Sequence, residues 1–117
     1  MVSLRTQKIP APMTRSVSKV EREGVINSLV KNKRKEDFTL FYYSLWDDRS
    51  DKVNNAMTEW VDKNPNSSEV VHTVNSWDLP HSFMVFSVTT VPALVTCRKG
   101  RIRVETYFPR VLKYFTK

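Results

Sequence analysis

The chain has 117 residues and a formal net charge of +7 at pH 7, a length at which one domain buries roughly two thirds of its unfolded surface. Its longest uncharged stretch, residues 79–97, is interrupted by two prolines and several polar residues, which excludes a bilayer span of about 20 apolar residues. The single cysteine, Cys97, excludes an internal disulfide framework and is compatible with a reducing compartment. We therefore expect a soluble, cytoplasmic protein with one folded domain.

The charge is distributed unevenly along the chain. Residues 1–35 carry nine Lys and Arg against two Glu, residues 36–78 carry three basic residues against nine acids, and residues 79–117 carry seven basic residues against one acid. Both ends are therefore basic and the middle is acidic. This asymmetry indicates binding to nucleic acid or to an acidic protein, or else a match between two surfaces within the molecule.

The first 17 residues have no apolar periodicity and contain two prolines, so we predict a flexible basic arm over residues 1–17 and a folded domain over residues 18–117. Ser18 and Glu21 have the spacing of a capping box, which predicts a helix over residues 19–31. The basic run at residues 31–35 suits the carboxyl end of that helix.

The middle of the chain gives the strongest periodic signals. Residues 37–45 are aromatic and nearly uncharged, as expected for a central strand buried on both faces. Residues 50–63 predict an amphipathic helix, because apolar residues recur at helical spacing. Residues 69–76 predict a further strand. The core is expected to combine residues from these and later elements: Phe41, Val53, Met57, Trp60, Leu94 and Leu112.

The last third of the chain predicts a short helix, a hairpin and a final helix. A short helix within residues 78–86 would direct Phe83, Met84 and Phe86 toward the core. Residues 93–97 and the alternating run from Arg101 to Glu105 flank a turn with Gly100, which predicts an antiparallel hairpin. Pro109 is expected at the start of the last helix. Because strands joined through a helix are parallel, the sheet is expected to be mixed.

Three local features resemble the thioredoxin family. Phe41-Tyr-Tyr-Ser-Leu-Trp46 resembles the aromatic strand that ends in the tryptophan before that family's active site, Asp78 stands where the family often ends its next strand, and Val91-Pro92 resembles its cis-proline. The resemblance covers residues 18–117 and implies an α/β, thioredoxin-like fold. We expect a four-stranded mixed sheet flanked by helices on both faces, and a cis peptide bond before Pro92.

The resemblance fails at the redox centre. Where the family has Cys-x-x-Cys after the tryptophan, this chain has Asp47-Asp48-Arg49-Ser50, and neither Asp nor Ser can exchange a disulfide. Cys97 lies in an apolar strand and is expected to be a core residue. Asp47 and Ser50 are good helix caps, so this segment could simply start a helix. The other interpretation is a redox-inert, protein-binding groove formed by Trp46, Asp47, Asp48, Arg49, Ser50, Val91 and Pro92.

Other chemistry is weakly supported. His72 and His81 lack metal-ligand spacing, and with two glycines in the chain no glycine-rich phosphate loop can form, so we expect no metal, no cofactor and no enzymatic activity. Two basic clusters could follow phosphates, or could be ordinary solvated turns. They comprise Lys31, Lys33, Arg34 and Lys35 in the first part of the chain, and Arg98, Lys99, Arg101 and Arg103 in the hairpin.

The leading hypothesis is a non-catalytic, thioredoxin-like protein-interaction module, such as an accessory or host-interaction factor of a larger assembly. The alternative is a nucleic-acid-binding protein that uses its basic N-terminal and C-terminal segments. We expect a protein partner and no membrane association, and the sequence leaves the oligomeric state open.

Overall fold

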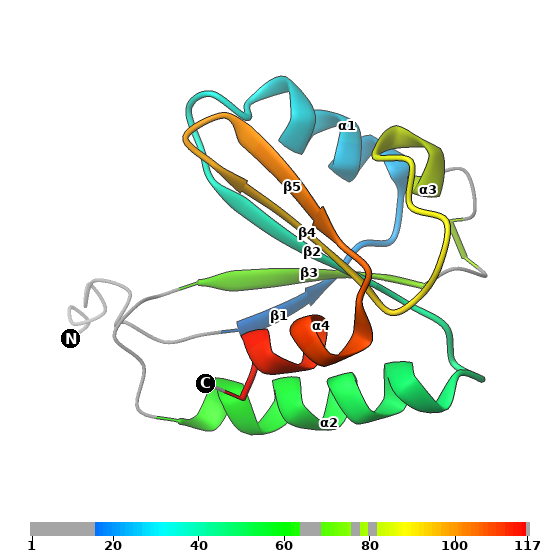
Figure 1. Ribbon diagram of the computed structural model, residues 1–117. Helices are drawn as coiled ribbons and strands as arrows, with labels where there is room; N and C mark the ends of the chain where they lie inside the picture. Colours follow the sequence, from blue (N-terminus) through cyan, green and yellow to red (C-terminus); the bar gives the residue numbers. More distant parts are fainter. Residues whose placement is uncertain (1–15, 64–68, 76–77, 80–81, 117) are drawn as a thin grey trace, which may run out of the picture.

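The computed structural model describes residues 16–63, 69–75, 78–79 and 82–116, and it consists of one mixed sheet with helices on both faces (Figure 1). Helices α1 and α3 lie on one side of the sheet, and α2 and α4 lie on the other. In chain order the elements are β1 (Ser16–Lys19), α1 (Glu23–Lys31), β2 (Phe38–Tyr43), α2 (Asp48–Asp62), β3 (Val70–Asn75), α3 (Ser82–Val85), β4 (Ala93–Arg98), β5 (Arg101–Glu105) and α4 (Phe108–Tyr114).

The sheet has five strands in the order β1-β3-β2-β4-β5, so the expectation of four strands was wrong. The additional strand, β1, pairs in parallel with β3, with Val17 opposite Val71. All four of its side chains are exposed, so it has no apolar pattern that sequence analysis could detect. Main-chain hydrogen bonds hold it in place, including one from Ser16 N to Glu69 O of 3.1 Å.

The first helix begins later than the capping box predicted. Ser18 and Lys19 belong to β1, and the strand path continues to Val20, whose N–H donates to Thr73 O at 2.9 Å. The helix starts at Glu23 after Arg22, which makes no side-chain capping bond. Pairing with β3 and burial of Val20 therefore override the local capping signal. Residues 1–15 of the predicted arm lie outside the described residues, so the predicted domain boundary stays a prediction.

Strand β2 is the centre of the fold, and all but the last of its six residues are buried. It pairs in parallel with β3 and in antiparallel fashion with β4. Because successive side chains of a strand face opposite ways, Leu40 and Tyr42 enter the core under α1 and α3, and Phe41 enters the core under α2 and α4. The prediction of a central strand buried on both faces is confirmed.

The predicted core is largely confirmed. Phe41, Val53, Met57, Trp60 and Leu94 are buried in one cluster, and Leu112 packs against it while partly exposed. The fully buried positions are instead Val111 of α4 and Phe115, the C-cap residue that follows this helix. Phe83 and Phe86 contact the opposite cluster as predicted. Met84 was expected to face the core, but its side chain is 76% exposed, because the single turn of α3 cannot bury its whole circumference.

The hairpin between β4 and β5 has a two-residue loop, Lys99-Gly100. Both residues have positive φ, 55° and 82°, which is the type I′ geometry whose twist matches that of the strands. The loop pairs Arg98 with Arg101 and brings Val104 opposite Val95. Within the described ranges, no helix is both long enough and apolar enough to cross a membrane.

Candidate functional site

Two loops meet at one end of the sheet, where the sequence placed its candidate groove. Tyr42 near the end of β2 is opposite Ala93 at the start of β4. The segment after β2 therefore leaves the sheet at the end where Pro92 enters it. The peptide bond between Val91 and Pro92 is cis, as predicted. Pro92 is buried, and Val91 packs on the core beside α1 and α3, so little of this pair is accessible from outside.

Asp47 and Ser50 fix the start of α2. The Asp47 carboxylate accepts hydrogen bonds of 2.9 Å from both Ser50 N and Ser50 Oγ, and Ser44 N donates to Ser50 Oγ at 3.2 Å. Ser50 is fully buried. The capping role considered from the sequence is therefore confirmed for Asp47, which is the N-cap residue of α2. These two side chains are occupied in holding the loop.

The outer side of the same loop is exposed and partly apolar. The Trp46 side chain is 73% exposed and that of Leu45 is 54% exposed. Asp48 and Arg49 follow in the exposed first turn of α2. The Arg49 Nε atom lies 4.0 Å from Asp47 Oδ1, at the limit of an ion pair. We call Leu45, Trp46, Asp48 and Arg49 the Trp46 surface.

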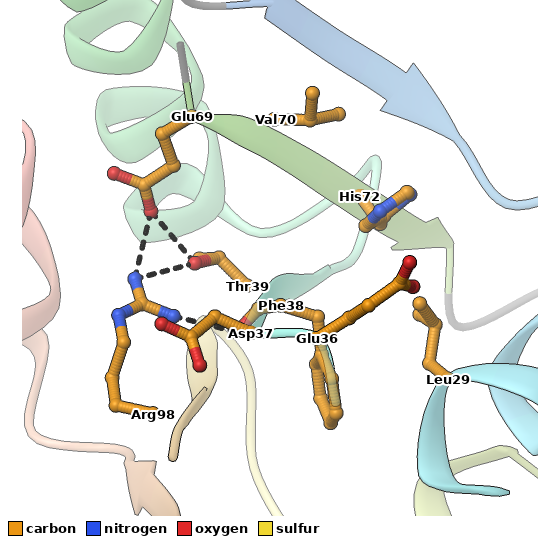
Figure 2. Close-up of a pocket in the computed structure, with 9 residues that line it drawn as sticks. All are labelled: Leu29, Glu36, Asp37, Phe38, Thr39, Glu69, Val70, His72 and Arg98. Atoms are coloured by element: carbon orange, nitrogen blue, oxygen red, sulfur yellow. Dashed lines mark hydrogen bonds and ion pairs between the residues drawn. The ribbon is translucent and has the colours of Figure 1, made fainter. Parts of the chain in front are cut away.

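A second site lies at the opposite end of the sheet, where β2 and β3 begin and β4 ends (Figure 2). It is a pocket of about 500 Å³ lined by Leu29, Glu36, Asp37, Phe38, Thr39, Glu69, Val70, His72 and Arg98. Its residues come from separate parts of the sequence, and none of them except Arg98 was a sequence candidate for binding. Burial lowers the pKa of His72, which favours its neutral form.

The polar side of this pocket is a closed hydrogen-bond network. Glu69 Oε2 accepts from Thr39 Oγ1 at 2.7 Å, from Arg98 Nη2 at 3.0 Å and from the Tyr114 hydroxyl. Arg98 Nη1 also donates to Phe38 O and to Cys97 O, each at 2.9 Å. The network therefore joins β2, the start of β3, β4 and α4. We call Thr39, Glu69, Arg98 and Tyr114 the clasp.

The clasp is suited to stability rather than to chemistry. Glu69 Oε2 and both terminal nitrogens of Arg98 already have partners inside the protein. No group of three or more potential metal ligands occurs in the part of the chain that the structure describes. Burial first, and then the hydrogen bond and charge of Glu69, raise the pKa of Tyr114 to about 12. The neutral phenol is therefore the form that the folded state prefers.

This preference predicts loss of stability at alkaline pH. A tyrosine whose folded-state pKa exceeds its unfolded value of about 10 contributes stability that is complete below pH 10 and is lost as the pH rises through about 12. Between about pH 9 and pH 11, urea unfolding should show a larger loss of free energy for the wild-type chain than for Tyr114→Phe. Equal losses of unfolding free energy in the two chains would contradict the raised pKa of Tyr114.

Cys97 is a core residue, as predicted. Its side chain is fully buried, and it is opposite Phe38 and Ile102 in the sheet. The thiol donates a weak hydrogen bond to Lys33 O at 3.6 Å. Phe38 is the first residue of β2, whereas α2 starts beyond the other end of that strand. The cysteine therefore lies at the end of the sheet away from the start of α2.

The two basic clusters of the sequence come together in the structure. The loop between α1 and β2 lies beside the tip of the β4–β5 hairpin: a Cβ at Gly100 would stand 3.6 Å from Arg34 Cγ, and Lys99 N donates to Asp37 Oδ1 at 2.9 Å. Arg98 departs from the predicted set, because its guanidinium is bound in the clasp. Lys33, Arg34 and Lys35 of the loop therefore lie near Lys99, Arg101 and Arg103 of the hairpin, whereas Lys31 is the last residue of α1.

Comparison with solved structures identifies the fold. Superposition on the reduced thioredoxin pre-protein of Schistosoma mansoni gives a TM-score of 0.66 at 10% identity, covering 86% of this chain and 96% of that one. For thioredoxin O2 of Arabidopsis thaliana the TM-score is 0.66 at 16% identity, over 86% and 91% of the two chains. For spinach chloroplast thioredoxin f it is 0.65 at 9% identity, over 92% and 96%.

The chain therefore has a thioredoxin-like fold, as the resemblance in its sequence predicted, with five strands in the sheet. At this level of identity the likeness concerns the fold. No protein-family model matches the sequence, and no curated protein matches it either. With one cysteine in the whole chain, the Cys-x-x-Cys motif is absent.

Proposed function

We propose that this chain is a non-catalytic, thioredoxin-like protein-interaction module that binds a protein partner through the Trp46 surface. The observation that carries the proposal is the exposure of Trp46, 73%, next to the exposed Leu45. Tryptophan is among the residues that contribute most to protein interfaces when a partner covers it. The proposal includes a cytoplasmic location and a role as an accessory or host-interaction factor within a larger assembly.

The polar neighbours of Trp46 suggest what the partner offers. Asp48 is exposed in the first turn of α2, where the positive end of the helix dipole already favours it. Its carboxylate can accept hydrogen bonds from a basic side chain or from backbone N–H groups of the partner. Arg49 beside it can donate to a carboxylate. An apolar centre with charged residues at its rim is the usual composition of a protein interface.

The absence of redox activity is a separate part of the proposal and has its own test. Disulfide exchange needs an accessible thiolate, whereas Cys97 is fully buried. We expect no reduction of insulin disulfides, and no reaction of Cys97 with a thiol reagent until the chain is unfolded by denaturant. Insulin reduction by the wild-type chain that disappears in Cys97→Ser would contradict this part of the proposal. The binding surface needs a separate assay.

A comparative capture experiment tests the binding surface. The wild-type chain, Trp46→Ala and Met84→Ala are used as baits in extracts of the native source. Met84 is the matched control because it is an apolar side chain of similar exposure, 76% against 73%, on α3 rather than in the β2–α2 loop. We expect a protein that is retained by the wild-type chain and by Met84→Ala and is lost with Trp46→Ala. Retention of the same protein by all three baits would refute the proposal that the Trp46 surface binds it.

A further inference from the structure

A strongly basic surface lies at the end of the sheet opposite Trp46. We define the basic end as Lys33, Arg34 and Lys35 of the α1–β2 loop together with Lys99, Arg101 and Arg103 of the β4–β5 hairpin. Packing of Arg34 against Gly100 and the hydrogen bond between Lys99 and Asp37 hold the two segments together. Figure 1 shows the loop and the hairpin tip side by side. Cations that lie more than 60 positions apart in the sequence therefore share one surface.

The six cations of this surface outnumber the two acids of the same loop, Glu36 and Asp37. Within the described ranges, none of its six cations takes part in an ion pair with a carboxylate. A groove of about 400 Å³ at the hairpin tip is lined entirely by Arg98, Lys99, Arg101 and Arg103. Arg98 is already paired with Glu69, but the other three walls are cations without an ion pair, and such a groove attracts anions because a bound anion relieves the repulsion among them.

The composition of the basic end distinguishes between kinds of anionic partner. The large apolar side chains that are exposed in the described residues include none within residues 31–37 or 98–103. Protein interfaces generally need such an anchor at their centre, whereas nucleic-acid interfaces are polar and strongly positive and can rest on phosphate contacts alone. No aromatic ring is exposed within the described residues 31–37 and 98–103, which also disfavours single strands, because their bases stack on such rings.

From these observations we propose that the basic end binds the phosphodiester backbone of duplex nucleic acid, without reading its sequence. Arginine and lysine side chains contact phosphates from outside the grooves, so DNA and RNA duplexes offer the same chemistry. The basic end lies beside Phe38 at the start of β2, and the Trp46 surface follows Tyr43 at its end. The six residues of that strand span roughly 20 Å, which lets the chain bind a duplex and a protein at the same time.

The test measures how salt weakens binding. Short fluorescein-labelled DNA and RNA duplexes are titrated with the full chain by fluorescence anisotropy, between about 50 and 200 mM salt. The plot of log affinity against log salt should fall with a slope of about −0.9 for each phosphate neutralised. The double variant Arg101→Gln, Arg103→Gln should bind more weakly, and its slope should be smaller in magnitude by about 1.8.

A control of equal net charge makes this result specific. Lys52 and Lys113 are exposed cations on α2 and α4, outside both the α1–β2 loop and the β4–β5 hairpin. The variant Lys52→Gln, Lys113→Gln should retain the affinity and slope of the wild-type chain, and so should Trp46→Ala. Equal losses in the two double variants would overturn the proposal, because the effect would then follow net charge alone. Equal binding of polyglutamate, or tighter binding of a single strand than of a duplex, would also overturn it.

Discussion

Replacing Met57 with alanine should lower the free energy of unfolding by about 2 to 5 kcal/mol, the range for truncating a buried side chain of this size. Met57 is 4% exposed on α2, in the cluster that also contains Phe41 and Trp60. Truncation removes apolar contacts and leaves a cavity that rigid neighbours can fill only in part. Phe115 makes an edge contact with each of those two aromatic rings, which restrains such a collapse.

Urea unfolding followed by circular dichroism measures this loss. Asn55→Ala is the matched control, because Asn55 is exposed on the same helix. We expect the control to change the free energy by less than about 0.5 kcal/mol. If Met57→Ala changes it as little, the apolar stripe of α2 does not form the core, and the packing of α2 on the sheet is wrong.

The sequence predicted those elements whose burial is visible as a pattern. Strand β2 lies within an aromatic run that carries no charge. Helix α2 has the apolar residues Val53, Met57 and Trp60, spaced by three or four positions, on the side that faces the sheet. In both cases the local pattern and the tertiary environment require the same residues. Gly100 likewise marks a turn in which positive φ is needed. These elements can be predicted from the sequence because local preference and global packing agree.

The features that were missed depend on contacts between distant residues. Strand β1 is held by main-chain hydrogen bonds to β3, and its exposed side chains form no apolar pattern that would indicate this pairing. The clasp joins Thr39, Glu69, Arg98 and Tyr114, each of which is ordinary in its local sequence. Arg98 was grouped with the basic residues around it, because sequence shows a charge but not the carboxylate that faces it across the sheet.

The candidate site shows the same division. Asp47 and Ser50 could be recognised as caps from their types and spacing, and the structure confirms their hydrogen bonds. The exposure of Trp46 could not be predicted, since a tryptophan after a buried strand can equally well fold back onto the core. The structure also shows that Asp47 is a poor site for testing binding. Its replacement would remove a cap that contributes about 1 kcal/mol, so Trp46 is the better choice.

Replacing Trp46 with alanine should weaken binding of the captured partner by at least about 2 kcal/mol, or roughly 30-fold, as expected for a residue at the centre of an interface. The folded chain should lose little stability, because the side chain is 73% exposed and leaves no internal cavity. Affinity and stability should therefore separate in this variant, in contrast to Met57→Ala. Urea unfolding of the same protein preparation checks that separation.

Isothermal titration of the purified partner into the wild-type chain, Trp46→Ala and Met84→Ala tests the central proposal most directly. Equal affinities for the wild-type chain and Met84→Ala, with a loss of about 30-fold or more for Trp46→Ala, are the result that we predict. The same affinity for all three chains would contradict the proposal, because the partner would then bind without the Trp46 surface.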